Sequence, residues 1–250
     1  MIHPPIDWKL IESKYFIHDP LDSMTVDILQ EQIQYYRERA SEYDEWFFRE
    51  GRYDRGEQHR RQWFSEVFEV EAALRASKPS GDVLDLACGT GLWTQHLVPL
   101  ANRVTAVDSS PEAIALNKQR VNSNSVEYIV ADIFNWTPNQ QFDYIFFGFW
   151  LSHIPKEKFA SFWQMIKGAL KPDGRIFFVD SLFTQDSTAK DHATLNKQGY
   201  AQRKLNDGQT YRIVKIFYEP NELEESLQNL GWYGYVHATE NYFLYGLFDR

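Results

Sequence analysis

The most informative segment of this 250-residue chain is VLDLACGTGLWT, residues 83–94. Its first residues are typical of a buried strand, Asp85 stands near the end of that strand, and small residues follow as a turn. Glycine lets the backbone of such a turn adopt positive φ and approach a ligand closely. A lone carboxylate there adds little to a hydrophobic core but suits a small polar ligand. The segment therefore predicts a binding site between a strand and the next helix, whose free N–H groups can face the ligand.

Short apolar segments alternate with amphipathic segments on the C-terminal side of this turn. Alternation of this kind predicts an α/β fold with a parallel, doubly wound sheet. The helix after the second strand has clear start signals, because Ser110 can act as the N-cap and Pro111 takes the first helical position. The five predicted strands are DVLDLA, RVTAVD, VEYIVAD, FDYIFFGFW and GRIFFVDS, the last introduced by a KPDG turn.

The flanking sequence predicts additions to this sheet. Helices are expected over 25–48 and 57–76, and residues 1–24 are expected to be irregular because they contain several prolines. We divide the chain into an N-terminal extension and helical cap, 1–78, and a core, 79–250, with a substrate-shaping insertion near 182–209. After the insertion, TYRIVKIFY predicts a strand, PNELEESLQNLG a helix and YGYVHATENYFLYGLF a final strand or hairpin.

Carboxylates end three of the predicted strands. Parallel sheets bind ligands at the carboxyl ends of their strands, where Asp85, Asp108 and Asp132 would line one edge. Asp108 follows Ala87 by 21 residues. That is close to the ~20-residue spacing at which an acidic residue binds a ribose diol, since a carboxylate accepts both hydroxyl protons. Asp132 could accept an adenine amino proton, with Ile133 against the ring, or it could serve only the turn that leaves the strand.

A nicotinamide dinucleotide site is the main alternative for a nucleoside-binding turn. It requires three glycines in the pattern G-x-G-x-x-G. Ala87, Gly89 and Leu92 occupy that register in this chain. Starting the register at Gly89 gives Gly89, Gly91 and Thr94 instead. Neither register fits the pattern, which leaves another nucleoside ligand or a purely structural glycine turn.

Five segments together resemble the class I S-adenosylmethionine (SAM)-dependent methyltransferase family. In the order and at the spacing of that family they are VLDLACGTG, VTAVDSSPEAIALNK, VEYIVADIFNW, FDYIFFGFWLSHIP and LKPDGRIFFVD. The similarity covers about 82–180, and the tail of the family fold would extend to residue 250. The resemblance implies SAM as the cofactor and a doubly wound seven-stranded sheet in the order 3-2-1-4-5-7-6, with strand 7 antiparallel.

The resemblance also assigns cofactor contacts to the strand ends. Carried over to this chain, Asp85 and the glycine turn would hold the methionine part of SAM. Asp108 and Ser109 would hold the ribose, and the pair Asp132 and Ile133 would hold adenine. Ala87 replaces a glycine that is frequent in the family, and its small side chain should preserve binding. The turn residues assigned in this way are Ala87, Gly89 and Gly91.

His153, in the segment GFWLSHIP after the fourth strand, is the predicted general base. A methyl group on a sulfonium is already activated, so the protein must align the acceptor and take its proton. The usual pKa of histidine suits proton transfer near neutral pH. Related small-molecule methyltransferases often carry a histidine near this position, but His153 could instead brace the next helix. Phe149 is predicted to line the cofactor edge, and Trp150 the substrate side, facing the cation.

The first predicted helix carries YYRERASEYDEW, in which Tyr36, Arg39 and Tyr43 are spaced to share a face. Related enzymes use a tyrosine-bearing N-terminal helix as a lid over the cofactor. By that resemblance, Tyr36 and Arg39 would contact SAM, Arg39 through the cofactor carboxylate, and Tyr43 would line the substrate site. The alternative is a helix that only packs on the domain through its aromatic side chains.

The composition restricts the partners of the chain. Its net charge of −9 disfavours nucleic acid, and its aromatic content of 16% suggests aromatic-lined pockets in addition to a core. Cys88 is the only cysteine, so no intramolecular disulfide can form, which suits the cytoplasm. No signal peptide, membrane span or metal-ligand spacing is expected. The segment RKLNDGQTYRIVK places Arg203 and Lys204 beside the insertion, as a binding patch or a solvated loop.

The sequence therefore predicts a cytoplasmic SAM-dependent methyltransferase. It would transfer a methyl group to an oxygen or nitrogen of a small, apolar or aromatic metabolite and release S-adenosylhomocysteine (SAH). Nucleic acid, membrane and metal are not expected as partners. The alternatives are a non-catalytic SAM-binding regulatory module and a methyltransferase that acts on carbon or on a protein.

Overall fold

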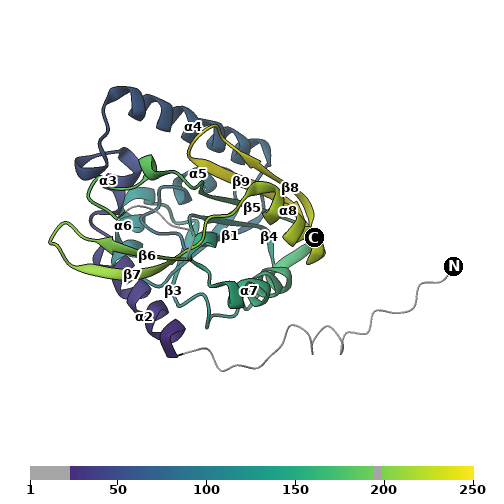
Figure 1. The fold of residues 1–250 in the computed structure, drawn as a ribbon. Coiled ribbons are helices and arrows are strands. Elements are labelled where there is room, and N and C mark those ends of the chain that lie inside the picture. The colour runs from purple at the N-terminus through teal and green to yellow at the C-terminus, as the bar shows by residue number, and fades with distance from the viewer. Residues whose placement is uncertain (1–22, 194–198) are drawn as a thin grey trace.

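A seven-stranded sheet forms the centre of the structure, a computed structural model that describes residues 23–193 and 199–250 (Figure 1). Its strands lie in the order β3-β2-β1-β4-β5-β9-β8. The neighbouring pairs from β3 to β5 are parallel, and β9 is antiparallel to both of its neighbours. Numbered within this sheet alone, the order is 3-2-1-4-5-7-6, so the predicted fold is confirmed. The strands are β1 (Asp82–Leu86), β2 (Arg103–Asp108), β3 (Val126–Val130), β4 (Phe142–Gly148), β5 (Leu170–Ser181), β8 (Tyr233–Ala238) and β9 (Phe243–Asp249).

Helices cover both faces of this sheet (Figure 1). The predicted helix 57–76 is confirmed as α4 (Glu57–Ala76), and the helix after Ser110 is confirmed as α6 (Pro111–Val121). Ser110 caps α6, because its Oγ accepts the N–H of Ala113 at 3.0 Å. The other helices are α2 (Ser23–Glu38), α3 (Tyr43–Phe48), α5 (Thr94–Leu97), α7 (Lys156–Ala169) and α8 (Pro220–Asn229), with short 3₁₀ turns η1 (Gly51–Tyr53), η2 (Leu151–His153) and η3 (Gln185–Ser187).

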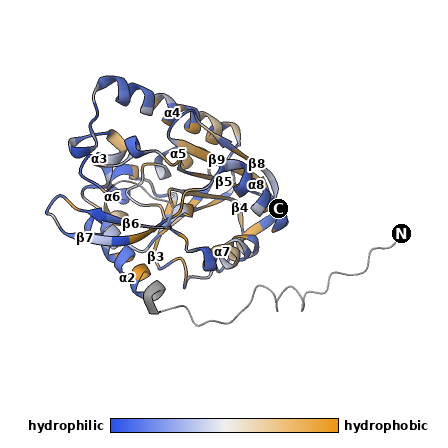
Figure 2. Ribbon diagram, viewed as in Figure 1, coloured by the Kyte–Doolittle hydropathy of each residue, from blue (hydrophilic) through white to orange (hydrophobic). Residues whose placement is uncertain are grey.

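The core consists of two apolar layers, one on each face of the sheet. Side chains alternate along each strand, so Phe147 and Phe178 pack with α7 and α8, whereas Phe146 and Phe177 pack with α4. The rings form stacked pairs across β4 and β5 on both faces. Figure 2 shows apolar residues on the central strands and polar residues along the outer helix surfaces. Much of the high aromatic content therefore fills the core.

A cap forms over the sheet from two parts of the chain that are far apart in sequence. Helix α2 lies beside a hairpin of β6 (Gly199–Lys204) and β7 (Thr210–Lys215), as Figure 1 shows. Ile28 and Leu29 of α2 pack against Val214 and Ile216 in a small apolar cluster. The hairpin forms a separate two-stranded sheet. The strand predicted in TYRIVKIFY thus exists, but its partner is β6, inside the predicted insertion.

Several local predictions are wrong in detail. The helix predicted over 25–48 is two helices, because the chain turns at residues 39–42 between α2 and α3. The helix after the glycine turn is short, since only Thr94–Leu97 is α-helical. The predicted KPDG turn lies inside β5, where the register with β4 shifts. The final hairpin is confirmed as β8 and β9.

The predicted domain division at 78/79 and the substrate-shaping role of 182–209 stay predictions. The irregular segment expected over 1–24 lies outside the described residues, apart from its last two positions, which belong to α2. No helix in the described ranges combines the length and apolar character that crossing a membrane requires.

Candidate functional site

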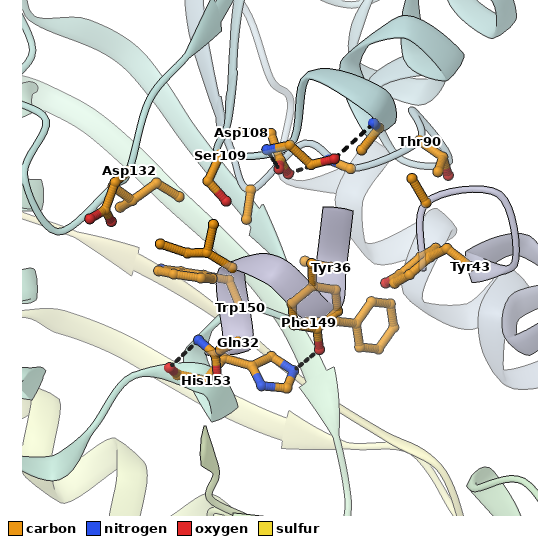
Figure 3. Close-up of a pocket in the computed structure, with 18 of the residues that line it drawn as sticks. Gln32, Tyr36, Tyr43, Thr90, Asp108, Ser109, Asp132, Phe149, Trp150 and His153 are labelled. Carbon is orange, nitrogen blue, oxygen red and sulfur yellow. Dashed lines mark hydrogen bonds between the residues drawn. The ribbon is translucent and has the colours of Figure 1, made fainter. Parts of the chain in front are cut away.

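A cavity that is partly open to solvent lies at the carboxyl ends of β1, β2, β3 and β4 (Figure 3). Helix α2 closes it from above the strand ends, with Leu29, Gln32 and Ile33 in its wall. Most of the predicted site residues meet in this one place. Those that line the cavity are Tyr36, Tyr43, Ala87, Gly89, Asp108, Ser109, Asp132, Ile133, Phe149, Trp150 and His153.

Asp85 lies beneath the glycine turn and not in the cavity wall. Its side chain is 1% exposed, and its Oδ2 accepts the hydroxyl proton of Thr94 at 2.6 Å. Its Oδ1 is buried without a hydrogen-bond partner among the described residues. Burial raises the pKa of Asp85 to about 7. Gly91, also predicted for the cofactor, lies against Asn117 behind the turn.

Two of the non-glycine residues with left-handed backbone line the cavity. Ala87 follows β1 with φ of 54°, and Phe149 follows β4 with φ of 56°. Such backbone costs non-glycine residues roughly 1–2 kcal/mol and persists only where the surroundings enforce it. The N–H of Phe149 donates to the carbonyl of Val179 at 2.7 Å, which holds this bend in place. The bends turn the chain sharply at two of the four strand ends that border the cavity.

Asp108 connects the glycine turn to the start of α6. Its Oδ2 accepts the N–H of Gly89 at 2.9 Å, and its Oδ1 accepts the N–H of Ser110 at 2.8 Å. Each carboxylate oxygen has two acceptor positions, so both can still accept a proton from a diol. Burial raises the pKa of Asp108, and the backbone N–H groups oppose that shift. The residue therefore both shapes the turn and presents acceptors to the cavity (Figure 3).

Asp132 performs the turn role that the sequence left open and still lies in the cavity wall. Its Oδ1 accepts the N–H of Phe134 at 3.0 Å, and its Oδ2 accepts from the side-chain amide of Asn135 at 2.6 Å. Ile133 beside it is buried and faces the same cavity. The two roles are compatible, because each carboxylate oxygen keeps a second acceptor position.

His153 forms a pair with Tyr36 of α2 (Figure 3). Its Nδ1 lies 2.7 Å from the carbonyl of Val214, and its Nε2 lies 2.7 Å from the Tyr36 hydroxyl. A carbonyl can only accept, so Nδ1 carries the proton and Nε2 accepts from Tyr36. Burial lowers the pKa of His153 well below its usual range, and the nearby charge of Lys215 acts in the same direction. The imidazole is therefore neutral at pH 7.

Gln32 is a residue that the sequence analysis missed. Its side-chain amide donates to the carbonyl of His153 at 3.2 Å and accepts the N–H of Val214 at 3.0 Å. Gln32 thereby fixes α2 to both segments that hold the histidine. The available signal was a glutamine that stands among the apolar residues Leu29 and Ile33 of a predicted helix.

A second cavity, also open to solvent, adjoins the first. Tyr36, Tyr43, Phe149 and His153 line both cavities. Arg39 lines the second cavity and not the first, in contrast to the contact with the cofactor that the sequence predicts.

Two further cations line this second cavity. Arg203 is buried there, whereas its neighbour Lys204 is exposed, so the two residues differ in role. Lys215, which the sequence analysis missed, also lines it. In the described ranges no group of three or more His, Cys, Asp or Glu side chains is placed to hold a metal ion.

Helix α3 is tied to the glycine turn through Asp44. The hydroxyl of Thr90 donates to Asp44 Oδ1 at 2.7 Å, and Arg120 of α6 forms an ion pair with Oδ2. Arg120 also donates to the hydroxyl of Thr90 at 3.0 Å. This set joins the cap to the turn that borders the first cavity.

Comparison with known proteins finds similarity in the part of the chain that contains the glycine turn and the strand ends. A methyltransferase domain profile matches residues 83–174. Nodulation protein S of Sinorhizobium fredii is 37% identical over 76 residues, which are 29% of this chain and 35% of that protein. The ubiquinone biosynthesis O-methyltransferase of Actinobacillus pleuropneumoniae is 31% identical over 104 residues, 38% of this chain and 44% of that protein. The chain thus spans less than half of either curated relative.

Solved structures match over more of the chain. DhpI in complex with SAH is 38% identical with a TM-score of 0.73, and the match covers 88% of this chain and 96% of DhpI. A complex of DhpI with SAM and HEP gives 37% identity, a TM-score of 0.74, and coverage of 89% and 98%.

The residues of the first cavity fit SAM as a ligand. Asp108 offers acceptors for a diol, and the unpartnered Oδ1 of Asp85 lies below the turn as a buried carboxyl oxygen that a cationic group could neutralise. Ile133 and Trp150 provide apolar surface for a purine ring. From the similarity to DhpI along nearly its whole length, the matching domain profile and the confirmed sheet order, the chain belongs to the class I SAM-dependent methyltransferase family.

Proposed function

We propose that this chain transfers the methyl group of SAM to an oxygen or nitrogen atom of a small molecule and releases SAH. The observation that carries this proposal is the junction of the two cavities at Tyr36, Tyr43, Phe149 and His153. A donor in the first cavity and an acceptor in the second would meet there, and such alignment can supply several kcal/mol, up to about 7–11. The aromatic rings at the junction support an acceptor with an apolar or aromatic part.

The first cavity would bind the cofactor through residues in its wall and through Asp85 beneath the glycine turn. Asp108 and Ser109 would bind the ribose, and Asp132 and Ile133 would bind adenine. Asp85 would balance the positive amino group of the methionine part. When bound, SAM supplies a methyl group that is activated by the positive charge on sulfur.

Tyr36 and His153 would move the proton that an O–H or N–H acceptor loses. The Nε2 lone pair of His153 is directed to the Tyr36 hydroxyl, 2.7 Å away. Tyr36 would take the proton from the acceptor while its own hydroxyl proton passes to Nε2. The hydrogen bond from Nδ1 to Val214 keeps the ring in the tautomer that this transfer needs. His153 would therefore act through Tyr36 and not by direct contact with the acceptor.

A binding and labelling experiment tests the proposed function. Calorimetry should show that SAM and SAH bind and that NADH does not. Incubation with methyl-labelled SAM and a pool of metabolites, followed by mass spectrometry, should then reveal a small molecule that gains the label. Binding without transfer to any small molecule, protein or carbon acceptor would favour a regulatory SAM-binding module instead. Binding of NADH in place of SAM would overturn the proposal.

Two variants test the proton path. His153→Ala and Tyr36→Phe should each lower kcat by roughly 10²–10⁴-fold, the usual contribution of general-base catalysis, while SAH affinity stays near that of the wild type. The exposed His237→Ala is the matched control and should leave kcat unchanged. If Tyr36→Phe retained full kcat with His153→Ala impaired, the histidine would act without the tyrosine, and the relay would be wrong.

A further inference from the structure

The second cavity has an unusual charge for a protein with a net charge of −9. Among the residues that the structure describes, three cationic side chains line it, Arg39, Arg203 and Lys215, and none of the lining residues is a carboxylate. Each of the three residues is only 8% exposed. Buried cations are costly unless an anion accompanies them. The source of that anion is therefore the question that this cavity raises.

The protein itself supplies little negative charge to these cations. Arg203 has no side-chain hydrogen bond and no ion pair within the described part of the chain. Arg39 donates to the hydroxyl of Tyr53 at 3.3 Å and stacks on the ring of Tyr43, with its Cζ 5.0 Å from the ring centre. These partners are neutral, so both guanidinium groups keep most of their donors free for a ligand.

Lys215 is the only one of the three cations that pairs with an acid in the described residues. Its Nζ donates to the hydroxyl of Ser152 at 2.8 Å and lies 3.6 Å from Asp180 Oδ1. The buried Asp180 also accepts the N–H groups of Ser152 and Ser181. Within the described ranges, one carboxylate paired with Lys215 therefore accompanies three cations, which leaves a surplus of positive charge.

The cations also act on one another, which shows that they share one environment. Burial lowers the pKa of Arg203, and the charge of Arg39 acts in the same direction. Burial lowers the pKa of Lys215 to about 8, opposed by Asp180 and reinforced by Arg203 and Arg39. Burial and Arg203 lower the pKa of His192, another lining residue, to about 4, so His192 is neutral and adds no charge.

We propose that the methyl acceptor carries an oxyanion group, of the carboxylate or phosphate kind, which Arg39, Arg203 and Lys215 bind in the second cavity. This proposal rests on the proposed function and adds the substrate class to it. Guanidinium groups bind carboxylates and phosphates through paired N–H donors, and a lysine adds a point charge. Because Tyr36 and His153 line the same cavity, the bound group would place the acceptor beside the site of methyl transfer.

The main rival is that these cations bind the carboxylate of the cofactor, as the sequence predicts for Arg39. The arrangement of the cavities favours the acceptor. Arg39, Arg203 and Lys215 line the second cavity and are absent from the wall of the first, where the strand-end carboxylates lie. The two assignments differ in a measurable way, because only the rival requires these cations for SAH affinity.

Binding of simple oxyanions to the SAH-loaded protein tests the proposal. SAH affinity is measured first by calorimetry, and failure of SAH to bind would contradict the proposed function itself. Inorganic phosphate and acetate are then titrated at constant ionic strength, with acetamide as the neutral analogue. We expect saturable 1:1 binding of at least one anion and none of acetamide. Preference for phosphate or for acetate identifies the kind of oxyanion, and binding of neither would overturn the proposal.

Arg203→Met and a matched control separate a binding role from a structural one. Arg203→Met should weaken binding of the preferred anion at least about tenfold, since a hydrogen bond to a charged group is lost. Its SAH affinity should be unchanged, and its melting temperature equal or higher, because a buried unpaired charge is removed. Lys204→Met removes a charge from the adjacent, exposed position and should change none of these quantities.

The outcomes that contradict the proposal are specific. A tenfold loss of SAH affinity in Arg203→Met would assign the cations to the cofactor carboxylate. A lower melting temperature with unchanged anion affinity would make Arg203 structural. If Arg203→Met does not fold, Lys215→Met is measured in the same way, and unchanged anion affinity in that variant would overturn the proposal.

Discussion

Asp85 is predicted to lower the stability of the free protein near neutral pH and to strengthen the binding of SAM. Burial raises the pKa of Asp85 in the folded protein to about 7 from 3.8. Between about pH 4 and pH 7 the folded protein therefore keeps a proton that the unfolded chain has already released. This contribution to stability is present below pH 4 and lost as the pH rises to 7. We predict that Asp85→Asn is about as stable as the wild type near pH 4 and more stable at pH 8, as measured by urea unfolding.

The same variant should bind SAM less tightly. The neutral amide introduced by Asp85→Asn would keep the hydrogen bond from Thr94 but could not balance a positive amino group. Loss of a charged hydrogen bond costs about 1–3 kcal/mol, which calorimetry can resolve. A stability difference that does not change between pH 4 and pH 8 would show that the carboxyl group does not titrate in this window.

Lys215 shows the opposite dependence of stability on pH. Its folded pKa is lowered to about 8 from 10.5, chiefly by burial, with Asp180 from β5 opposing and Arg203 and Arg39 reinforcing the shift. Between these two values the unfolded chain holds a proton that the folded protein has released, so stability rises with pH. We predict that wild type gains stability relative to Lys215→Met from pH 8 to pH 10.5 in urea unfolding.

Binding of an oxyanion gives an independent check on that titration. Loss of the ammonium charge above pH 8 should weaken phosphate binding in the wild type but not in Lys215→Met. Phosphate itself becomes more negative over this range, which would strengthen binding, so the predicted sign is opposite to that trend. Phosphate affinity that stays constant or increases from pH 7 to pH 9.5 would show that Lys215 does not contact the anion.

At the scale of elements, the break between α2 and α3 positions the cap. The turn at 39–42 lets Asp44, in the first turn of α3, meet Thr90 and Arg120. Both partners of the ion pair are partly buried, so the pair is worth about 1 kcal/mol. We predict that Asp44→Asn raises the dissociation rate of SAH several-fold in stopped-flow measurements, because α3 is held less firmly on the glycine turn.

An exposed ion pair provides the control for this prediction. Glu57 and Arg61 form an i,i+4 pair at the start of α4, with side chains that are 77% and 75% exposed. Glu57→Gln should therefore leave the SAH dissociation rate unchanged. Equal rates in Asp44→Asn and the wild type would mean that α3 does not control release of the cofactor.

Elements of the main sheet were predictable because their signals are local. The continuous apolar runs in FDYIFFG and RIFFVDS, and the cap at Ser110, are each contained in one short segment. The break at 39–42 was not predictable, since its sequence, RASE, contains no glycine or proline. Tertiary contacts of Asp44 favour the turn instead. The hairpin was missed in part because GYAQRK is polar, and its pairing with β7 is a long-range choice that no local pattern reports.

At the scale of the whole molecule, one part of the candidate site was predictable from local sequence signals and another part was not. Residues at the ends of β1, β2 and β4 were predictable because parallel strands end at one edge of the sheet. The cations were harder to place, since Arg203 and Lys215 occupy inward positions of a hairpin whose orientation depends on the packing of α2. Gln32 likewise gains its role only when α2, η2 and β7 meet.

The cap and the sheet should also differ in dynamics, because they differ in buried apolar support. The cap relies on small clusters such as Ile28 and Leu29 with Val214 and Ile216, whereas β1, β4 and β5 lie between two extensive apolar layers. We predict that amides of α2 and of β6–β7 exchange with deuterium at least about tenfold faster than those of β4. SAH with the bound oxyanion should slow exchange in the cap and leave the sheet unchanged, and Arg203→Met should remove only the oxyanion effect. Exchange of cap and sheet at one common rate would show that they unfold as a single unit.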